Sequence, residues 1–525
     1  MMKRRCIASG WVLWLGLIFP TLHWAQVPPL DSLKQEVTAA VDSRKEFTQV
    51  VIDSIFSFSE LGFQEYQTSK FLTETLEREG FRVEHGVASI PTAWVASWGN
   101  GKPVIGFMAD IDGLPETSQK PGVAYHIPLI QGGPGHGEGH NAGQAVNLTA
   151  AIAVKNLMRK YRIGGTLRLY PGVAEELLAS RNYMVRAGLF KDVDVMLSTH
   201  VSADFGVSYG PLNTGLVSTQ YSFHGMSAHG ASSPWMGRSA LDAVEIMDVA
   251  WNFRREHLRP EQRSHYVIVQ GGDQPNVVPP EATVWYFFRE WDYERIKNLH
   301  ALGTRMAKAA ADMTDTTMTE RILAATWPGH YNKAVAEALD ANIRAVGMPA
   351  WSATDSALAK AIQKEIGSQP EGLKLAVTEL RSGHDEFGAG SDDIAEVSWN
   401  LPTVVLRYPA NIPNLIAHHW SSAVAMATPI AHKGATAGAK AHAMTALDLL
   451  LKPELVTAAW NYFREQTKET QWQSLIPDDV QAPTDLNKEK MQRFRPELEK
   501  LYYNPAKYRS YLEQLGIQYP TLRTQ

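Results

Sequence analysis

Gly135-His136-Gly137-Glu138-Gly139-His140-Asn141 stands directly before a helix-forming run rich in Ala, Val and Leu at residues 142–160. Glycine at alternate positions allows a tight backbone, which brings imidazole and carboxylate side chains together. One interpretation is a phosphate loop, because G-x-G-x-G resembles a dinucleotide fingerprint. The intervening residues are instead His, Glu and His, and no strand is predicted immediately before the loop. The stretch therefore favours a metal site with Glu138 and His140 as ligands.

Further acidic and histidine residues follow predicted strands of the same α/β pattern. They are Ala174-Glu175-Glu176 after residues 166–170, His200 after 193–199, His418-His419-Trp420 after 401–406, and Asp110-Ile111-Asp112-Gly113-Leu114-Pro115 after 104–108. Open α/β sheets carry their sites at the carboxyl ends of strands. A solvated acidic pair at a helix start is the alternative interpretation of Glu175 and Glu176. Because four such groups occur at strand-to-helix junctions, we expect them to meet in one metal site.

The order of predicted elements indicates two folded parts and a tail. Strands alternate with helices in residues 30–211 and 326–452, which predicts an α/β catalytic domain with a mostly parallel sheet flanked by helices. A β-α-β-β-α order in residues 212–325 predicts an inserted ferredoxin-like α+β domain. Residues 453–525 are expected to form a polar, helical C-terminal extension.

Composition and the N-terminus restrict the class of protein. The 525 residues include 50 Lys+Arg and 55 Asp+Glu, and the net charge of −5 gives no electrostatic footprint for nucleic acid. The single cysteine, Cys6, excludes a disulfide framework, a thiolate zinc site and an iron–sulfur cluster. A basic head followed by the apolar run 11–19 predicts a signal peptide over residues 1–25. We therefore expect a periplasmic or secreted protein with no membrane attachment after signal removal, and an uncleaved anchor is the alternative.

Together these motifs resemble a family of dinuclear metallopeptidases that includes aminoacylases, carboxypeptidases and p-aminobenzoyl-glutamate hydrolase. They resemble in particular the branch of the p-aminobenzoyl-glutamate hydrolases. The motifs that carry the resemblance are Asp-x-Asp-Gly-Leu-Pro, Gly-His-Gly-x-Gly-His-Asn, Ala-Glu-Glu, the strand-end histidine and the late His-x-Trp-Ser, supported by residues 390–399 and 430–434. The resemblance extends in order from about residue 40 to the end of the chain.

The resemblance implies two divalent metal ions, Mn²⁺ or Zn²⁺, and a role for each matching residue. The implied metal ligands are Glu138 at the bridging position, His140, Glu176, His200 and His418, with His419 the less favoured of the histidine pair. The implied reaction residues are Glu175 as general base for a metal-bridging water, His229 and Asn276 at the carbonyl oxygen, and Arg289 at the substrate. The residues expected to orient the ligands are Asp110, Asp112 and His136. One departure is Glu138, because this branch normally has cysteine there; an oxygen ligand favours Mn²⁺ or Zn²⁺.

The implied activity is hydrolysis of the amide bond of a small N-acyl amino acid, with N-aroyl amino acids such as p-aminobenzoyl-glutamate included. The inserted domain would serve as a lid and would form a homodimer, in which His229 reaches the partner's site. Two alternatives remain open: a dipeptidase or carboxypeptidase, and a non-catalytic binding protein of the same fold. A serine hydrolase is not favoured, because the chain has no G-x-S-x-G elbow. Residues 225–229 match this motif except at the last position, where histidine replaces glycine.

Overall fold

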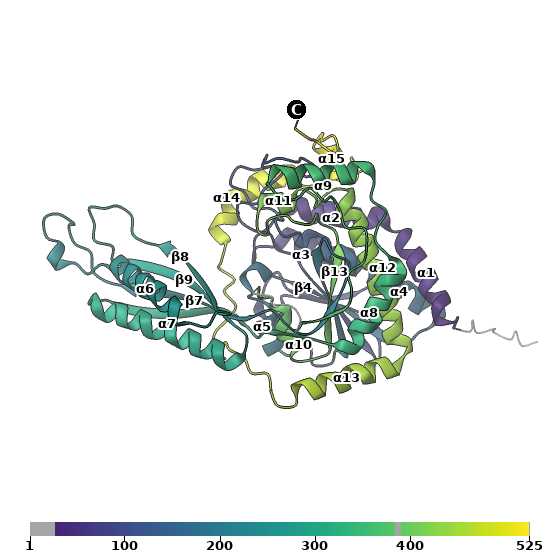
Figure 1. The fold of residues 1–525 in the computed structure, drawn as a ribbon, viewed down its shortest axis with the longest axis horizontal. Coiled ribbons are helices and arrows are strands. Elements are labelled where there is room, and N and C mark those ends of the chain that lie inside the picture. The colour runs from purple at the N-terminus through teal and green to yellow at the C-terminus, as the bar shows by residue number, and fades with distance from the viewer. Residues whose placement is uncertain (1–26, 384–389, 524–525) are drawn as a thin grey trace, which may run out of the picture.

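The computed structural model describes residues 27–383 and 390–523. The predicted signal peptide, residues 1–25, lies outside the described residues. Figure 1 shows a rounded body, to which both the early and the late parts of the chain contribute, and an elongated arm formed by the middle of the chain. In the ranges that the structure describes, no helix has the length and apolar character that crossing a membrane requires.

A six-stranded sheet with the order β1-β2-β4-β3-β5-β13 lies at the centre of the body. Its strands are β1 (Arg82–His85), β2 (Trp94–Asn100), β3 (Val104–Asp110), β4 (Gly165–Gly172), β5 (Val195–Ser202) and β13 (Thr403–Pro409). The strands β4, β3, β5 and β13 run parallel, whereas β1 and β2 form an antiparallel edge. Strand β3 is buried along its whole length, as expected for a sheet covered on both faces. The predicted α/β class with a mostly parallel sheet is confirmed.

Helices surround this sheet and complete the core of the body. They are α1 (Leu30–Asp42), α2 (Lys45–Phe58), α3 (Tyr66–Arg78), α4 (Gly143–Tyr161), α5 (Arg181–Arg186), α8 (Lys333–Val346), α9 (Ala353–Glu365), α10 (Ile394–Ser398), α11 (Trp420–Ala423) and α12 (Pro429–Leu451). The long helices α4 and α12 pack on each other, and α4 also contacts β3, β4 and β5. Nearly every residue of α4 before its last turn is buried, which fixes the loop that precedes it.

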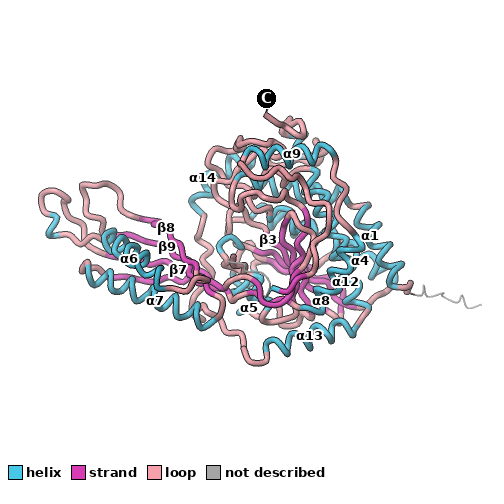
Figure 2. The backbone as a smooth tube through the Cα atoms, in the orientation of Figure 1, coloured by secondary structure: helices cyan, strands magenta, loops and turns pink. Residues whose placement is uncertain are grey.

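The arm, residues 215–326, is a four-stranded antiparallel sheet with two helices packed on it (Figure 2). Its elements are β7 (Gly215–His224), α6 (Ala240–Arg254), β8 (Arg263–Gln270), β9 (Glu281–Glu290), α7 (Tyr293–Met313) and β10 (Thr317–Thr326). The order β10-β7-β9-β8 is ferredoxin-like, and it includes β10, which the sequence analysis did not predict. Burial alternates along β9, so one face of the sheet contacts the helices. Aromatic residues such as Trp251, Tyr286 and Phe288 form the separate core of the arm.

A small sheet joins the arm to the body, and the C-terminal extension contacts both parts. The joining strands are β6 (Ser208–Leu212), β11 (Gly329–Tyr331) and β12 (Arg381–Ser382), and the helices of the extension are α13 (Pro453–Thr467), α14 (Lys488–Leu498) and α15 (Tyr511–Gln514). Strands β6 and β11 are the two connections to the arm, and they pair with each other. The extension reaches the arm through the ion pair of Asp485 with Arg321 at 2.5 Å, and the body through the indole of Trp472, which donates to Glu396 at 2.7 Å.

Candidate metal centre and active site

The carboxyl ends of the parallel strands bring the predicted ligands together. Asp110 ends β3, and His200 lies near the end of β5. Glu175 and Glu176 occupy a short 3₁₀ turn, Glu175–Leu177, directly after β4. The remaining predicted ligands come from the glycine-rich loop before α4 and from the loop after β13. The structure therefore places all five predicted ligands in one cluster at one edge of the sheet.

Glu138 lies between two histidines in this cluster. Its Oε2 is 2.7 Å from His418 Nε2, and its Oε1 is 3.3 Å from His200 Nε2. Glu176 Oε2 is 3.5 Å from the same nitrogen of His418. His140 lies deeper, with Nδ1 3.8 Å from Glu176 Oε1 and Nε2 3.7 Å from Glu175 Oε2. These separations suit groups that share metal ions.

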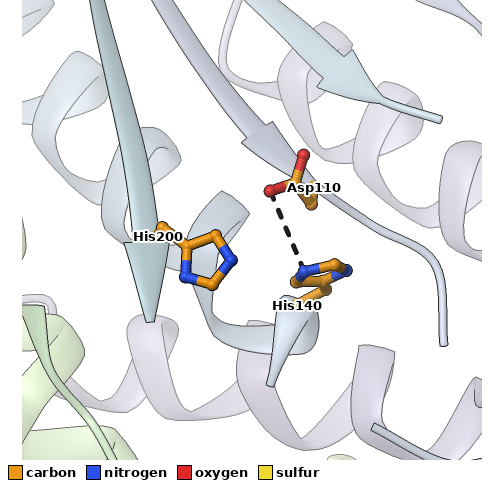
Figure 3. A group of neighbouring side chains, drawn as sticks. All are labelled: Asp110, His140 and His200. Atoms are coloured by element: carbon orange, nitrogen blue, oxygen red, sulfur yellow. Dashed lines mark ion pairs between the residues drawn. The ribbon is translucent and has the colours of Figure 1, made fainter. Parts of the chain in front are cut away.

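Two of the three groups of side chains whose ligand atoms lie within 4.8 Å of one another contain His140: Asp110 with His140 and His200, and Glu138 with His140 and Glu176. Figure 3 shows the first group, in which Asp110 Oδ2 is 3.9 Å from His140 Nε2. Asp110 was expected to orient a ligand, and the structure places it within reach of an ion as well. His140 belongs to both groups, which fits a pair of neighbouring ions.

Unpaired buried atoms provide an independent test of the fit to metal. Both ring nitrogens of His140 and Oε1 of Glu176 are buried without a hydrogen-bond partner among the described residues. Buried polar atoms are normally paired, and bound ions would satisfy these atoms. His200 donates from Nδ1 to the carbonyl of Val201 at 2.9 Å, and its Nε2 faces Glu138. Carboxylate oxygens and imidazole nitrogens of this kind fit divalent ions such as Zn²⁺ or Mn²⁺.

The carboxylates differ strongly in their pKa values. Burial, and next the charge of Asp392, raises the pKa of Glu175 well above its ordinary value. Burial and the charge of Glu138 do the same to the pKa of Glu176. Burial also opposes ionisation of Glu138, but hydrogen bonds from His200 and His418 outweigh it and hold the pKa of Glu138 well below its ordinary value. Burial and neighbouring negative charges disfavour the ionised form of several of these carboxylates. Positive charge, such as that of metal ions, would stabilise the ionised cluster.

Local backbone features fix the ligand positions. Gly139 has φ +95°, and a Cβ there would lie 2.7 Å from Met426 Cε, so the position between Glu138 and His140 requires glycine. Asp112 accepts the backbone N–H of Glu176 at 3.1 Å, and its other oxygen is 3.4 Å from His140 Nδ1. Asp112 therefore fixes the backbone of Glu176 and faces the ring of His140.

Two supporting contacts lie behind the ligands. Glu65, which the sequence analysis did not single out, accepts the N–H of Ala174 at 2.8 Å and holds the left-handed turn before Glu175. His136 bonds to the carbonyl of Ile55 at 3.1 Å, and burial, followed by the charge of His140, lowers its pKa to about 3. His136 is therefore neutral and anchors the glycine-rich loop to α2.

A fully buried arginine, Arg181, holds a second acidic group beside the ligands. It forms ion pairs with Asp110 and Asp393, and it lies 3.8 Å from Asp392. Asp393 also accepts the backbone N–H of Arg181 at 2.9 Å at the start of α5. Asp392 and Asp393 lie with Glu175 in a third close group of acidic atoms. Arg181 therefore neutralises the carboxylates that surround the general base candidate.

We expect Arg181→Met to lower the free energy of unfolding of the metal-free protein by about 3–5 kcal/mol, because it leaves buried carboxylates without their cation. Chemical denaturation measures the change. Arg159→Met, at an exposed position of α4, is the matched control and should change stability by less than about 0.5 kcal/mol. Equal stability of the two variants would show that Arg181 does not stabilise the protein by neutralising the buried carboxylates.

The remaining predicted residues divide between the site and the arm. Arg289 lines a cavity of about 390 Å³ together with Glu138, Glu175, Glu176, His200 and His418, which we call the metal cavity. His229 and Asn276 lie on loops of the arm and do not line this cavity. The N–H groups of Ala231 and Ser232 both donate to His229 Nδ1 at 3.1 Å, so the ring proton resides on Nε2. One chain thus brings Arg289 to the metal cavity but not the other two residues.

Comparison with known proteins decides the family. The sequence profile of peptidase family M20/M25/M40 matches residues 106–426, the segment that holds every predicted ligand. The chain belongs to this family. Among M20 relatives, the B subunit of p-aminobenzoyl-glutamate hydrolase from Escherichia coli (strain K12) is 32% identical over 476 residues, which cover 85% of this chain and 98% of the relative. The Xaa-Arg dipeptidase of Homo sapiens is 25% identical over 469 residues, which cover 85% and 95%.

A solved structure supports the M20 fold. The aminobenzoyl-glutamate utilization protein from Klebsiella pneumoniae aligns with a TM-score of 0.52 at 17% identity and covers 80% of this chain and 98% of its own. The M20 relatives named above are a hydrolase and a dipeptidase. With the metal-ligand groups at the strand ends, this establishes the chain as a metal-dependent amidohydrolase or peptidase.

Proposed function

We propose that this M20 enzyme hydrolyses the amide bond of an N-acyl amino acid, and that N-aroyl substrates such as p-aminobenzoyl-glutamate are among them. The observation that carries the proposal is the position of Glu175, a carboxylate in the metal cavity 3.7 Å from the candidate ligand His140. A binding protein needs ligands for its ions but no such free carboxylate beside them. The similarity to the p-aminobenzoyl-glutamate hydrolase of Escherichia coli supports the choice of substrate class.

The residues of the metal cavity have distinct tasks in this reaction. Divalent ions, Mn²⁺ or Zn²⁺, would be held by the predicted ligands and would polarise the amide carbonyl and lower the pKa of a water molecule. Glu175 accepts the proton of the attacking water on its carboxylate and then delivers it to the amide nitrogen as the amino acid leaves. The guanidinium of Arg289 binds a substrate carboxylate.

We further propose that two copies of the chain form a homodimer through the arm, so that His229 and Asn276 of one copy donate hydrogen bonds to the carbonyl oxygen in the other. Strand β8 is the last strand of its sheet and exposes Val267 (56%) and Ile268 (46%). An exposed apolar edge strand offers unpaired backbone groups to a second chain. The Escherichia coli relatives carry the names of two different subunits of one hydrolase, so a mixed assembly is the alternative outcome.

We expect Ile268→Lys to convert the dimer to monomers and to lower kcat/KM by about 10²-fold, because the partner's oxyanion donors are lost. Sedimentation velocity and activity as a function of protein concentration measure both effects. Leu375→Lys, at an exposed apolar position of the body, is the control and should change neither. A wild-type protein that is monomeric and fully active would contradict the homodimer.

A substrate screen tests the proposed function. Purified protein supplied with Mn²⁺ or Zn²⁺ is assayed against p-aminobenzoyl-glutamate, other N-acyl amino acids and dipeptides. The proposal expects the N-acyl amino acids to have the highest kcat/KM. Faster cleavage of dipeptides with C-terminal arginine would favour a dipeptidase, the activity in the name of the Homo sapiens relative. Metal and substrate binding without turnover would instead indicate a binding protein.

We also propose that residues 1–25 direct export and that the mature enzyme is periplasmic or secreted. The basic head, short apolar run and following proline of the N-terminal sequence support this proposal. Fractionation of an expressing bacterium and sequencing of the mature N-terminus test it. A protein found in the cytoplasm with Met1 retained would overturn the proposal.

A further inference from the structure

A second cavity opens beside the metal cavity. Its volume is also about 390 Å³, and its lining includes Tyr331, Lys374, Thr378 and Arg381; we call it the side cavity. Arg407 and Asn213 belong to the linings of both cavities. A substrate group that extends from the metal cavity toward the side cavity therefore passes Arg407.

Arg407 is held by its backbone, and its charge has no partner among the described residues. It lies on β13, where its N–H donates to Gly206 O at 2.9 Å and its carbonyl accepts from Gly206 N at 3.0 Å. The side chain is partly buried, and across residues 27–383 and 390–523 its guanidinium has no hydrogen bond or ion pair. Lys374 in the side cavity differs, because its ammonium group pairs with Asp204. Arg407 is thus a free cation in a cavity wall, as far as the described residues show.

Arg289 and Arg407 come from different parts of the fold, and both line the metal cavity, as Arg263 also does. Arg289 comes from β9 of the arm, and its Nε is buried without a hydrogen-bond partner among the described residues. Arg407 comes from the body. The nearby carboxylates Glu138 and Glu176 are engaged by His418. A partly buried guanidinium is matched best by a carboxylate, which it binds through two parallel hydrogen bonds.

We propose that Arg407 is a specificity residue that binds the side-chain carboxylate of an acidic amino acid in the substrate, while Arg289 binds its α-carboxylate. The inference rests on the proposed amide hydrolysis and names the class of amino acid that the enzyme releases. The substrate class is an N-acyl dicarboxylic amino acid. An uncharged side chain of the same shape leaves Arg407 unpaired and should bind less well.

The test compares N-acyl-glutamate with the N-acyl-glutamine of the same acyl group, since the two differ only in the charge of the side chain. Wild-type enzyme should prefer the glutamate substrate by about 10–100-fold in kcat/KM, mainly through KM. Arg407→Gln should abolish the preference by reducing activity on the glutamate substrate alone, and Arg407→Lys should retain part of it. Lys468→Gln, which changes a cation that is already paired with Glu465 and lines neither cavity, is the matched control and should keep the wild-type preference.

Calorimetry with free glutamate and free glutamine supplies a readout that does not need turnover. The metal-loaded wild-type protein should bind glutamate more tightly, and Arg407→Gln should remove the difference. The proposal is overturned if Arg407→Gln weakens both amino acids equally, or if the wild type does not distinguish them. If the proposed function is wrong, no N-acyl amino acid is cleaved. Calorimetry still tests the role of Arg407 in that case.

Discussion

Glu175→Gln is expected to lower kcat by about 10³-fold while the metal content of the protein stays unchanged. The amide of glutamine has the shape of the carboxylate but cannot accept a proton from water. Glu175 lies 3.7 Å from His140 but belongs to neither of the two ligand groups that contain His140, so the ions should remain in place. Initial rates with a saturating N-acyl amino acid and elemental analysis of the purified protein measure the two effects.

Glu497→Gln, at an exposed position of α14, is the matched control and should keep full activity. The substitution makes the same chemical change far from the metal cavity, so it reports any general effect on the preparation. Loss of metal in Glu175→Gln would identify Glu175 as a ligand instead of a base. Full activity of Glu175→Gln with full metal content would exclude both roles.

Glu138→Ala is expected to abolish measurable activity and to weaken metal binding by more than about 100-fold, because even the loss of a residue that only supports a ligand costs about 10–100-fold. Glu138 is the carboxylate nearest both His200 and His418. Without it the two histidines lose the group that lies between them. Metal titration followed by calorimetry measures the affinity, and metal retained at the wild-type level would contradict the bridging role.

Glu138→Cys restores the residue that the related branch normally carries and gives a sharper control. The thiolate should recover part of the metal affinity, and its activity should then be lost on treatment with thiol-modifying reagents. The wild-type enzyme should resist the same reagents, since its single cysteine is Cys6 in the predicted signal peptide. If the thiol-modifying reagents affected the activity of both proteins equally, the side chain at position 138 would have no part in the reaction.

The sequence predicts the parts of the site that have local patterns. Glycines alternate with His136, Glu138 and His140 in one loop, and the acidic pair Glu175-Glu176 directly follows a strand. The structure brings these groups together because parallel strands end at one edge of the sheet. The α/β class follows from the same alternation of strands and helices.

The residues that sequence analysis missed have no local pattern. Arg181 contacts Asp110 and Asp393 across 71 and 212 positions of the chain, so only the folded protein shows their charge balance. Asp393 accepts the backbone N–H of Arg181 and also pairs with its guanidinium, and no local pattern predicts either contact. Strand β10 was missed because Thr319-Glu320-Arg321 interrupts the apolar alternation in its exposed first half. The helix α9 was also missed, although Ser352 and Asp355 form a capping box that marks its start.

The most direct test of the account is a titration of metal-free enzyme with Mn²⁺ while p-aminobenzoate release from p-aminobenzoyl-glutamate is followed. Without metal we expect no release. Turnover should rise with added ion and saturate once the sites formed by Glu138, His140, Glu176, His200 and His418 are filled. Binding of Mn²⁺ without release of p-aminobenzoate or of any other acyl group from an N-acyl amino acid would contradict it.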